Sequence, residues 1–183
     1  LYEENEKAKH FDFDGLDIFM EGSRRKGHFN GVATIVEKLF RITTPEKAFF
    51  GEKDLQQLQI IKYVTKQLKL SVEIIGIPTK REESGLAMSS RNKLLSKSDL
   101  QKAILIHKTL KFIKENISNF KLDELKKLAI ERFIMQKDMN LEYLEIVSLE
   151  KLQPISEFKD KNENVACIAA SISSVRLIDN IIF

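Results

Sequence analysis

A run of small and charged residues in the first half of the chain has the composition of an anion-binding turn. The segment 51–54, Gly-Glu-Lys-Asp, directly follows the apolar residues 48–50. If these apolar residues form a short buried strand that turns into a helix, exposed backbone N–H groups and Lys53 favour phosphate there. Asp54 could cap the helix or accept a hydrogen bond from a ribose hydroxyl, and Gln57 would project from the same helix end. A capped helix with solvated charges explains the same residues without a ligand.

A second cluster, at 85–92, places small hydroxyl side chains beside a guanidinium. Ser89, Ser90 and Arg91 are consecutive in it. Arginine grips phosphate through a rigid fork and serine hydroxyls add short-range donors, so the set suits a polyphosphate. In isolation the segment could equally be a polar linker. Because the two clusters lie on either side of a domain boundary expected near Lys80, a nucleotide bound by both could draw the domains closed.

A third cluster is a charged loop at 20–31, punctuated by glycines, which should lead into a helix beginning near Gly31. Glycines permit tight backbone turns there. His28 could titrate near neutrality, but backbone hydrogen bonds commonly hold a loop histidine, and we do not assign it as a catalytic base. His10 and His107 have no neighbouring metal ligands in the sequence.

Hydrophobic periodicity predicts the elements that position these residues. Apolar residues at helical spacing predict a helix through 32–40 that ends before Pro45. A second helix, at 55–68, should lie between strands at 48–50 and 72–77. Strand, helix, strand with short connections is a βαβ unit, which implies parallel strands.

The pattern changes after Pro78. Ser96 should cap a long helix, and a second helix should run from 123 to 137. Three strands should follow, at 141–147, 165–170 and 175–182. Helices followed by strands indicate an α+β domain. We therefore expect two domains, 1–80 and 81–183.

Two further features have structural interpretations. Cys167 is the only cysteine and lies in an apolar run, so we expect a buried thiol without a disulfide or structural zinc. A reducing cytoplasm is the simplest compartment for such a chain. The Asp179-Asn180 pair should only close the edge of a strand.

Charge and hydropathy argue against several classes of function. Lysine and arginine number 30 against 27 acidic residues, and the two signs are interspersed, which argues against a nucleic-acid partner. No apolar run approaches the ~20 residues that a membrane span needs. Scattered carboxylates and the lack of a Gly-x-Ser-x-Gly turn give no indication of a hydrolase.

The three clusters, in this order and spacing, resemble the pantothenate synthetases. The matching segments are spread over essentially the whole chain: 21–22, 27–29, 51–54, 56–57, 88–92 and 176–180. Several separated motifs that agree are far more specific than any one of them. The resemblance implies an α/β fold, the second part of a Rossmann-like nucleotidyltransferase domain followed by a smaller α+β C-terminal domain, in a cytoplasmic homodimer.

The implied reaction joins pantoate to β-alanine in two steps. The carboxylate of pantoate attacks the α-phosphorus of ATP, with Mg²⁺ supporting the nucleotide, and gives pantoyl adenylate and pyrophosphate. The amine of β-alanine then displaces AMP. Preorganised cations and N–H groups would stabilise the charge that spreads over the phosphate oxygens.

Residue roles carry over from the resemblance. Lys53, Ser89 and Arg91 would act catalytically on the phosphates, and Lys80 would touch adenine through its backbone. The implied ATP-binding positions are Gly51, Glu52, Lys53, Asp54, Lys80, Met88, Ser89, Ser90 and Arg91. The implied pantoate-binding positions are Gln57, which would hold pantoate, and Phe50, Val32, Ile35 and Val36, which would line the apolar side of the pocket. No metal ligand is implied.

The chain departs from the family pattern in its first part. It contains neither the family's His-x-Gly-His motif nor its first pantoate-binding glutamine, and Lys26 stands where relatives usually have proline. It opens at Leu1 in a polar stretch and resembles a C-terminal two-thirds, so we expect it to be inactive alone, as a folded or dimerisation module. The alternative enzyme is a class I aminoacyl-tRNA synthetase fragment, because 88–91 resembles that group's mobile loop, but no basic stripe for tRNA is evident.

Overall fold

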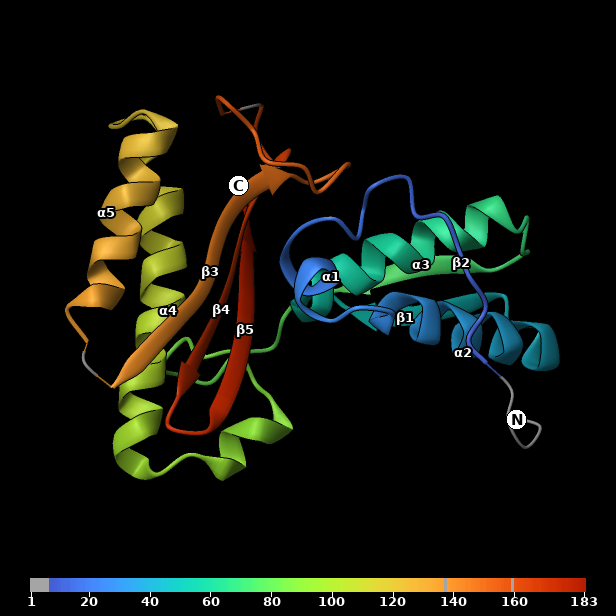
Figure 1. The fold of residues 1–183 in the computed structure, drawn as a ribbon, viewed down its shortest axis with the longest axis horizontal. Coiled ribbons are helices and arrows are strands. Elements are labelled where there is room, and N and C mark those ends of the chain that lie inside the picture. Colours follow the sequence, from blue (N-terminus) through green and yellow to red (C-terminus); the bar gives the residue numbers. More distant parts are fainter. Residues whose placement is uncertain (1–6, 137, 159) are drawn as a thin grey trace. The chain divides into compact units, whose positions relative to one another are not determined.

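The computed structural model describes residues 7–136, 138–158 and 160–183. The chain forms two compact units, Leu1–Pro78 and Thr79–Phe183 (Figure 1). Within the described ranges, no helix combines the length and the apolar character needed to cross a membrane.

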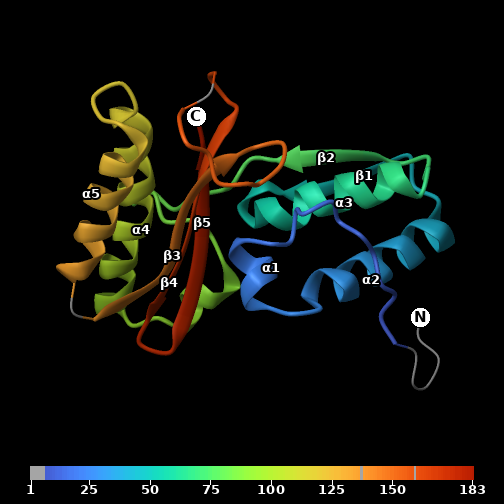
Figure 2. The same ribbon diagram turned by 45° about the horizontal axis from the view of Figure 1, so that its top comes forward.

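The first unit contains a βαβ motif. Its elements are α1 (Met20–Arg24), α2 (His28–Thr43), β1 (Lys47–Gly51), the 3-10 helix η1 (Glu52–Asp54), α3 (Leu55–Gln67) and β2 (Glu73–Ile77). β1 and β2 pair in parallel, with Lys47 opposite Glu73 and Gly51 opposite Ile77. α3 packs against both strands and against α2 (Figure 2). The predicted strand, helix and parallel strand are therefore confirmed.

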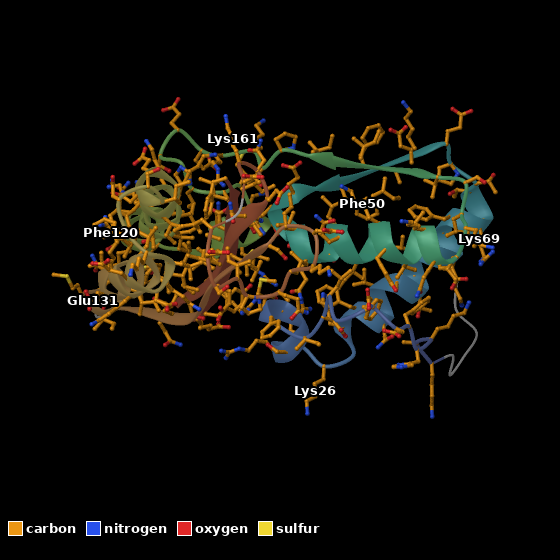
Figure 3. All side chains as sticks on the ribbon, turned by 90° about the horizontal axis from the view of Figure 1, so that it is seen from above. Lys26, Phe50, Lys69, Phe120, Glu131 and Lys161 are labelled. Atoms are coloured by element: carbon orange, nitrogen blue, oxygen red, sulfur yellow. The ribbon has the colours of Figure 1, made fainter. Side chains whose placement is uncertain are left out.

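The strand β1 is less buried than its apolar residues suggest. Exposed and half-buried residues alternate along it, and Phe49 is 63% exposed. Phe50 lies on the side of the strands that faces the helices (Figure 3) and its ring packs edge-on against Phe40 of α2, with centroids 6.5 Å apart. The expectation of a buried strand is wrong, because the side chains at alternate positions point to opposite faces and the helices cover the Phe50 face.

The entry into α2 is set by two glycines. The helix begins at His28, not near Gly31 as predicted, directly after Gly27 at φ 73°. This left-handed conformation costs glycine little and other residues more. A side chain at Gly22 would collide with the carbonyl oxygen of Asp17. The loop therefore needs glycine at both positions, once for its dihedral angle and once for space.

The buried face of α2 combines the apolar Phe29 and Ala33 with the polar Thr34 and Glu37. Glu37 accepts hydrogen bonds from Lys9 Nζ and Arg41 Nε, both at 2.8 Å. The hydroxyl of Thr34 accepts one from the backbone N–H of Lys9, also at 2.8 Å. Part of the predicted apolar stripe is turned outward: Ile35 is 41% exposed and Leu39 is 38% exposed. The helix is confirmed, but its buried face was not the one that the apolar spacing indicates.

The second unit packs two helices against a three-stranded antiparallel sheet. Its elements are η2 (Ser90–Leu94), α4 (Lys97–Asn116), α5 (Leu122–Ile134), β3 (Met139–Ser148), β4 (Asn164–Ile172) and β5 (Val175–Ile182). The sheet order is β3-β4-β5. α4 and α5 lie side by side against the sheet (Figure 1). This is the predicted arrangement of helices followed by strands.

Local signals in the second unit are confirmed. The hydroxyl of Ser96 accepts a hydrogen bond from the backbone N–H of Asp99 at 3.0 Å and caps α4. Cys167 on β4 is buried. The core between helices and sheet is apolar and includes Ile106, Leu110, Ile113, Leu125, Phe133, Ile146, Ile168 and Ile172.

The ion pairs of Glu37 generate a prediction about stability. Burial alone would raise the pKa of Glu37, but the hydrogen bonds and charges of Lys9 and Arg41 outweigh it, so the pKa lies below its ordinary value. Stabilisation by such a group is present above its unfolded pKa and is lost as pH falls through the folded pKa. Glu37→Gln should lower the free energy of unfolding at neutral pH by about 1.5–3 kcal/mol.

Urea unfolding at neutral pH and near pH ~3 measures this effect, and the difference between variant and wild type should shrink in acid. Glu46→Gln is the matched control, because Glu46 is exposed. A deficit for Glu37→Gln that is the same at both pH values would contradict the role of the charge.

Candidate functional site

The turn after β1 brings Lys53 to the carboxyl end of the parallel strands. Gly51 ends β1, η1 follows, and α3 begins at Leu55. The side chain of Lys53 is mostly buried, 21% exposed, and its Nζ lies 3.8 Å from Asp54 Oδ1. Among the described residues, an added Cβ at Gly51 would meet no atom within 4 Å, so the space at this glycine is open. An open glycine turn followed by a cation at this edge of the sheet suits a phosphate.

Asp54 occupies the N-cap position of α3 without capping it. Its side chain makes no capping hydrogen bond, and its backbone has φ −98° and ψ 55°. The interpretation of Asp54 as a helix cap is therefore wrong, because 3-10 geometry precedes α3 and the carboxylate turns toward Lys53 instead. Its role toward a ribose hydroxyl stays a prediction.

Two adjacent glutamines in the first turn of α3 have different surroundings. Gln56 is buried, and its Nε2 donates to the carbonyl oxygens of Leu16 at 2.8 Å and Phe19 at 2.9 Å. Its Oε1 accepts from the backbone N–H of Glu21 at 3.0 Å. Gln57 is half buried. Sequence reasoning missed Gln56, because its partners are backbone groups 35 to 40 residues away.

His28 is the first residue of α2, and its ring centroid lies 5.0 Å from that of Phe29. It is therefore not held in a loop as expected. Burial, and then the charge of Arg25, lower the pKa of His28 below its ordinary value, so the imidazole is neutral near pH ~7. The exposed side chain of Lys26 projects away from the unit (Figure 3).

The predicted pantoate-binding residues all belong to the first unit. Gln57 starts α3, Phe50 lies on β1, and the other three lie on α2, which packs against α3. On α2, Val32 and Val36 are half buried and Ile35 is exposed. The unit thus presents apolar side chains of α2 and β1 together with one amide of α3.

The second predicted cluster follows a hairpin in the second unit. The backbone N–H of Met88 donates to the carbonyl oxygen of Lys80 at 2.9 Å, and Arg81 pairs with Ala87 in an antiparallel bridge. Beyond the hairpin, Ser89 Oγ accepts from the backbone N–H of Arg91 at 3.3 Å. This segment is an ordered turn that leads into η2.

A cavity of about 810 Å³ opens where this turn meets α4. Met88, Ser89 and Ser90 line it, and Leu100 and Ile104 of α4 form part of its apolar wall. Arg91 instead donates from Nη1 to the carbonyl oxygen of Arg176 on β5 at 3.3 Å. The cavity brings three of the residues with an implied ATP role to one wall.

Asp179 does not close a strand edge. It is buried inside β5 and accepts two hydrogen bonds from Arg81, at 2.6 and 3.0 Å. The expectation for Asp179-Asn180 is therefore wrong: a carboxylate inside a strand needs a partner, and a guanidinium from the hairpin supplies it. Burial, and then the charge of Arg81, lower the pKa of His107, whose ring packs at Gly85.

Comparison with known families identifies this arrangement. The family model described as pantoate-beta-alanine ligase matches residues 2–182. The chain belongs to this family. The pantothenate synthetase of Christiangramia forsetii is 42% identical over 181 residues, which are 99% of this chain and 64% of that relative. That of Bacteroides thetaiotaomicron is 43% identical over 174 residues, 95% of this chain and 62% of the relative.

Solved pantothenate synthetases share the fold. The crystal structure from Thermus thermophilus has a TM-score of 0.86 and 37% identity, covering 91% of this chain and 60% of that one. The pantoate-beta-alanine ligase of Francisella tularensis, crystallised with beta-gamma ATP and beta-alanine, has a TM-score of 0.65 and 32% identity, covering 91% and 55%. The α/β class, with its parallel segment and small antiparallel sheet, is confirmed, and the aminoacyl-tRNA synthetase alternative is set aside.

The chain spans a little under two thirds of the length of the curated relatives that it matches, 64% for the first of those above. The matched part contains the turn with Lys53 and the segment with Ser89 and Arg91 that follows the hairpin.

The buried amide of Gln56 generates a prediction about stability. Gln56→Leu replaces the amide with an apolar side chain of similar size and removes the hydrogen bonds to two carbonyl oxygens and one N–H group. We expect the free energy of unfolding to fall by about 2 kcal/mol or more. Urea unfolding measures this, with Gln67→Leu on the exposed end of the same helix as the control. Equal effects of the two substitutions on the free energy of unfolding would show that the three hydrogen bonds of Gln56 do not stabilise the fold.

Proposed function

We propose that the whole protein, of which this chain forms the matched part, is an AMP-forming ligase that condenses pantoate with β-alanine. The observation that carries the proposal is the family match along residues 2–182. Support also comes from the position of Lys53 and Gln57, which lie within one turn of each other where β1 meets α3. A cation and a neutral amide at one strand end suit the two substrates of an adenylation step.

The proposed reaction has an adenylation step and an amide-forming step. A carboxylate oxygen of pantoate attacks the α-phosphorus of ATP, the bond to pyrophosphate breaks, and pantoyl adenylate forms. The amine of β-alanine then attacks the acyl carbon, loses a proton, and the bond to AMP breaks. In this scheme Lys53, Ser89 and Arg91 stabilise the negative charge on the phosphate oxygens.

The remaining roles follow the chemistry of the side chains. Gln57 would hold pantoate by donating to its carboxylate and accepting from a hydroxyl. The ATP positions would be Gly51 to Asp54, Lys80 and Met88 to Arg91, and Mg²⁺ would accompany the phosphates, because Mg²⁺ is usually held by substrate phosphates and water. A homodimer, and inactivity of this chain by itself, are further parts of the proposal that rest on the family resemblance.

Lys53 provides the first test of the adenylation step. In the full-length enzyme, Lys53→Ala should slow adenylate formation roughly a hundredfold, about 3 kcal/mol, because one preorganised cation is lost from the phosphates. Pantoate binding should change little. Pyrophosphate release in single-turnover experiments measures the step, and Lys62→Ala on the exposed face of α3 is the control. A Lys53→Ala rate within about twofold of wild type would remove Lys53 from the mechanism.

Gln57 and Arg91 test the division of the site between its ligands. Gln57→Ala should weaken pantoate binding and spare ATP, whereas Arg91→Ala should do the reverse, because an amide suits hydroxyl and carboxylate groups and a guanidinium suits a polyphosphate. Each substitution should cost its own ligand about 1–3 kcal/mol. Calorimetric titration of each ligand into each full-length variant at fixed Mg²⁺ measures both. If both variants lost ATP affinity and kept pantoate affinity, Gln57 would belong to the nucleotide site.

A further inference from the structure

The residues just before Ser89 form a compact hairpin. Glu82 donates its backbone N–H to the carbonyl oxygen of Leu86 at 2.9 Å, and Gly85 donates to that of Glu82 at 2.8 Å. Gly85 turns the chain at φ 89°. An added Cβ at Gly85 would collide with the ring of His107 on α4, so the hairpin tip fits closely against that helix.

Arg81 makes four hydrogen bonds, three of which fix this hairpin to β5. Its guanidinium donates to both carboxylate oxygens of Asp179, at 2.6 and 3.0 Å. It also donates to the carbonyl oxygen of Gly85 at 3.1 Å and to that of Asn180 at 3.2 Å. The side chains of Arg81 and Asp179 are 22% and 3% exposed. Because a planar guanidinium carries five donors in a fixed geometry, lysine could not reproduce this set.

The other end of the segment contacts the same strand. Arg91 Nη1 donates to the carbonyl oxygen of Arg176 at 3.3 Å, and Asn92 Nδ2 donates to that of Ala87 at 3.1 Å. β5 therefore holds the segment both before Ser89, through Asp179, and after it, through the backbone at Arg176. The longer and weaker of these contacts belongs to Arg91, which is exposed.

We propose that Arg81 and Asp179 are positioning residues for ATP: their ion pair holds the hairpin on β5 so that Ser89 and Arg91 meet the phosphates in a fixed position. The inference rests on the proposed function, in which Ser89 and Arg91 contact ATP. Four of the five N–H donors of Arg81 are given to protein acceptors, so its guanidinium has little capacity left for a phosphate. The charge of Arg81 pairs with Asp179 inside the fold. Arg81 contributes to ATP binding by fixing the position of the segment that carries Ser89 and Arg91.

The test compares ligand affinities of full-length variants. Arg81→Lys keeps the charge but loses the fork, and should raise the dissociation constant for ATP about tenfold or more, with pantoate within about twofold. Asp179→Asn should act in the same direction, and it supplies the comparison if Arg81→Lys does not fold. The control is Lys126→Met, which breaks the 2.7 Å ion pair with Glu145 between α5 and β3 in the same unit. It should lower the melting temperature without changing ATP affinity.

A double-mutant comparison separates positioning from general damage. In a Ser89→Ala/Arg91→Ala background, adding Arg81→Lys should weaken ATP binding by about twofold or less, because the contacts that it positions are already gone. A full tenfold effect in that background, or equal losses for ATP and pantoate, would overturn the positioning role while leaving the proposed phosphate contacts intact. If the Ser89→Ala/Arg91→Ala protein bound ATP as tightly as wild type, the proposed phosphate site and this inference would both be wrong.

Discussion

Buried backbone groups in irregular segments must find hydrogen-bond partners, and this constraint shapes both units. Outside helices and strands the backbone pairs with itself only in part, and each buried N–H or carbonyl left unpaired costs about 1–3 kcal/mol. In the first unit, Gln56 supplies an amide to the chain around α1. In the second, Arg81 and Asn92 do the same for the hairpin before Ser89. The segments that carry the candidate chemistry can be irregular because hydrogen bonds from these side chains replace the missing backbone–backbone hydrogen bonds.

The parallel pairing of β1 with β2 adds a second constraint. Parallel strands end at the same edge, so the turn that follows β1 lies at the carboxyl edge, and α3 must cross back over one face. Lys53 lies in that turn, where its charge is partly withdrawn from water. Partial burial strengthens the interaction of this charge with an anion.

Much of the fold could be predicted because its signals are local. Each of these signals lies within about ten residues of sequence: the helical spacing, the serine before α4 and the short connections around α3. The structure confirms all three. The buried face of α2 could not be predicted in this way, because Glu37 forms an ion pair with Lys9, which lies 28 residues earlier. The same reason hid Gln56 from sequence reasoning and gave Asp179 the wrong role: their partners are set by tertiary structure, not by spacing. For the candidate site, the residue types indicated phosphate chemistry, but the hydrogen bonds that support these residues could not be predicted from the sequence.

The long separation between Arg81 and Asp179 has a consequence for synthesis. Asp179 follows Arg81 by 98 residues, and at a translation rate of about 5–20 residues per second it leaves the ribosome roughly 5 to 20 s later. During that interval the hairpin can form its own backbone hydrogen bonds, but the guanidinium of Arg81 cannot yet pair with the carboxylate of Asp179. The first unit can meanwhile fold, since all of its elements precede the hairpin. Closure of the second unit is therefore a late, long-range event, which contact-order arguments make the slower step of folding.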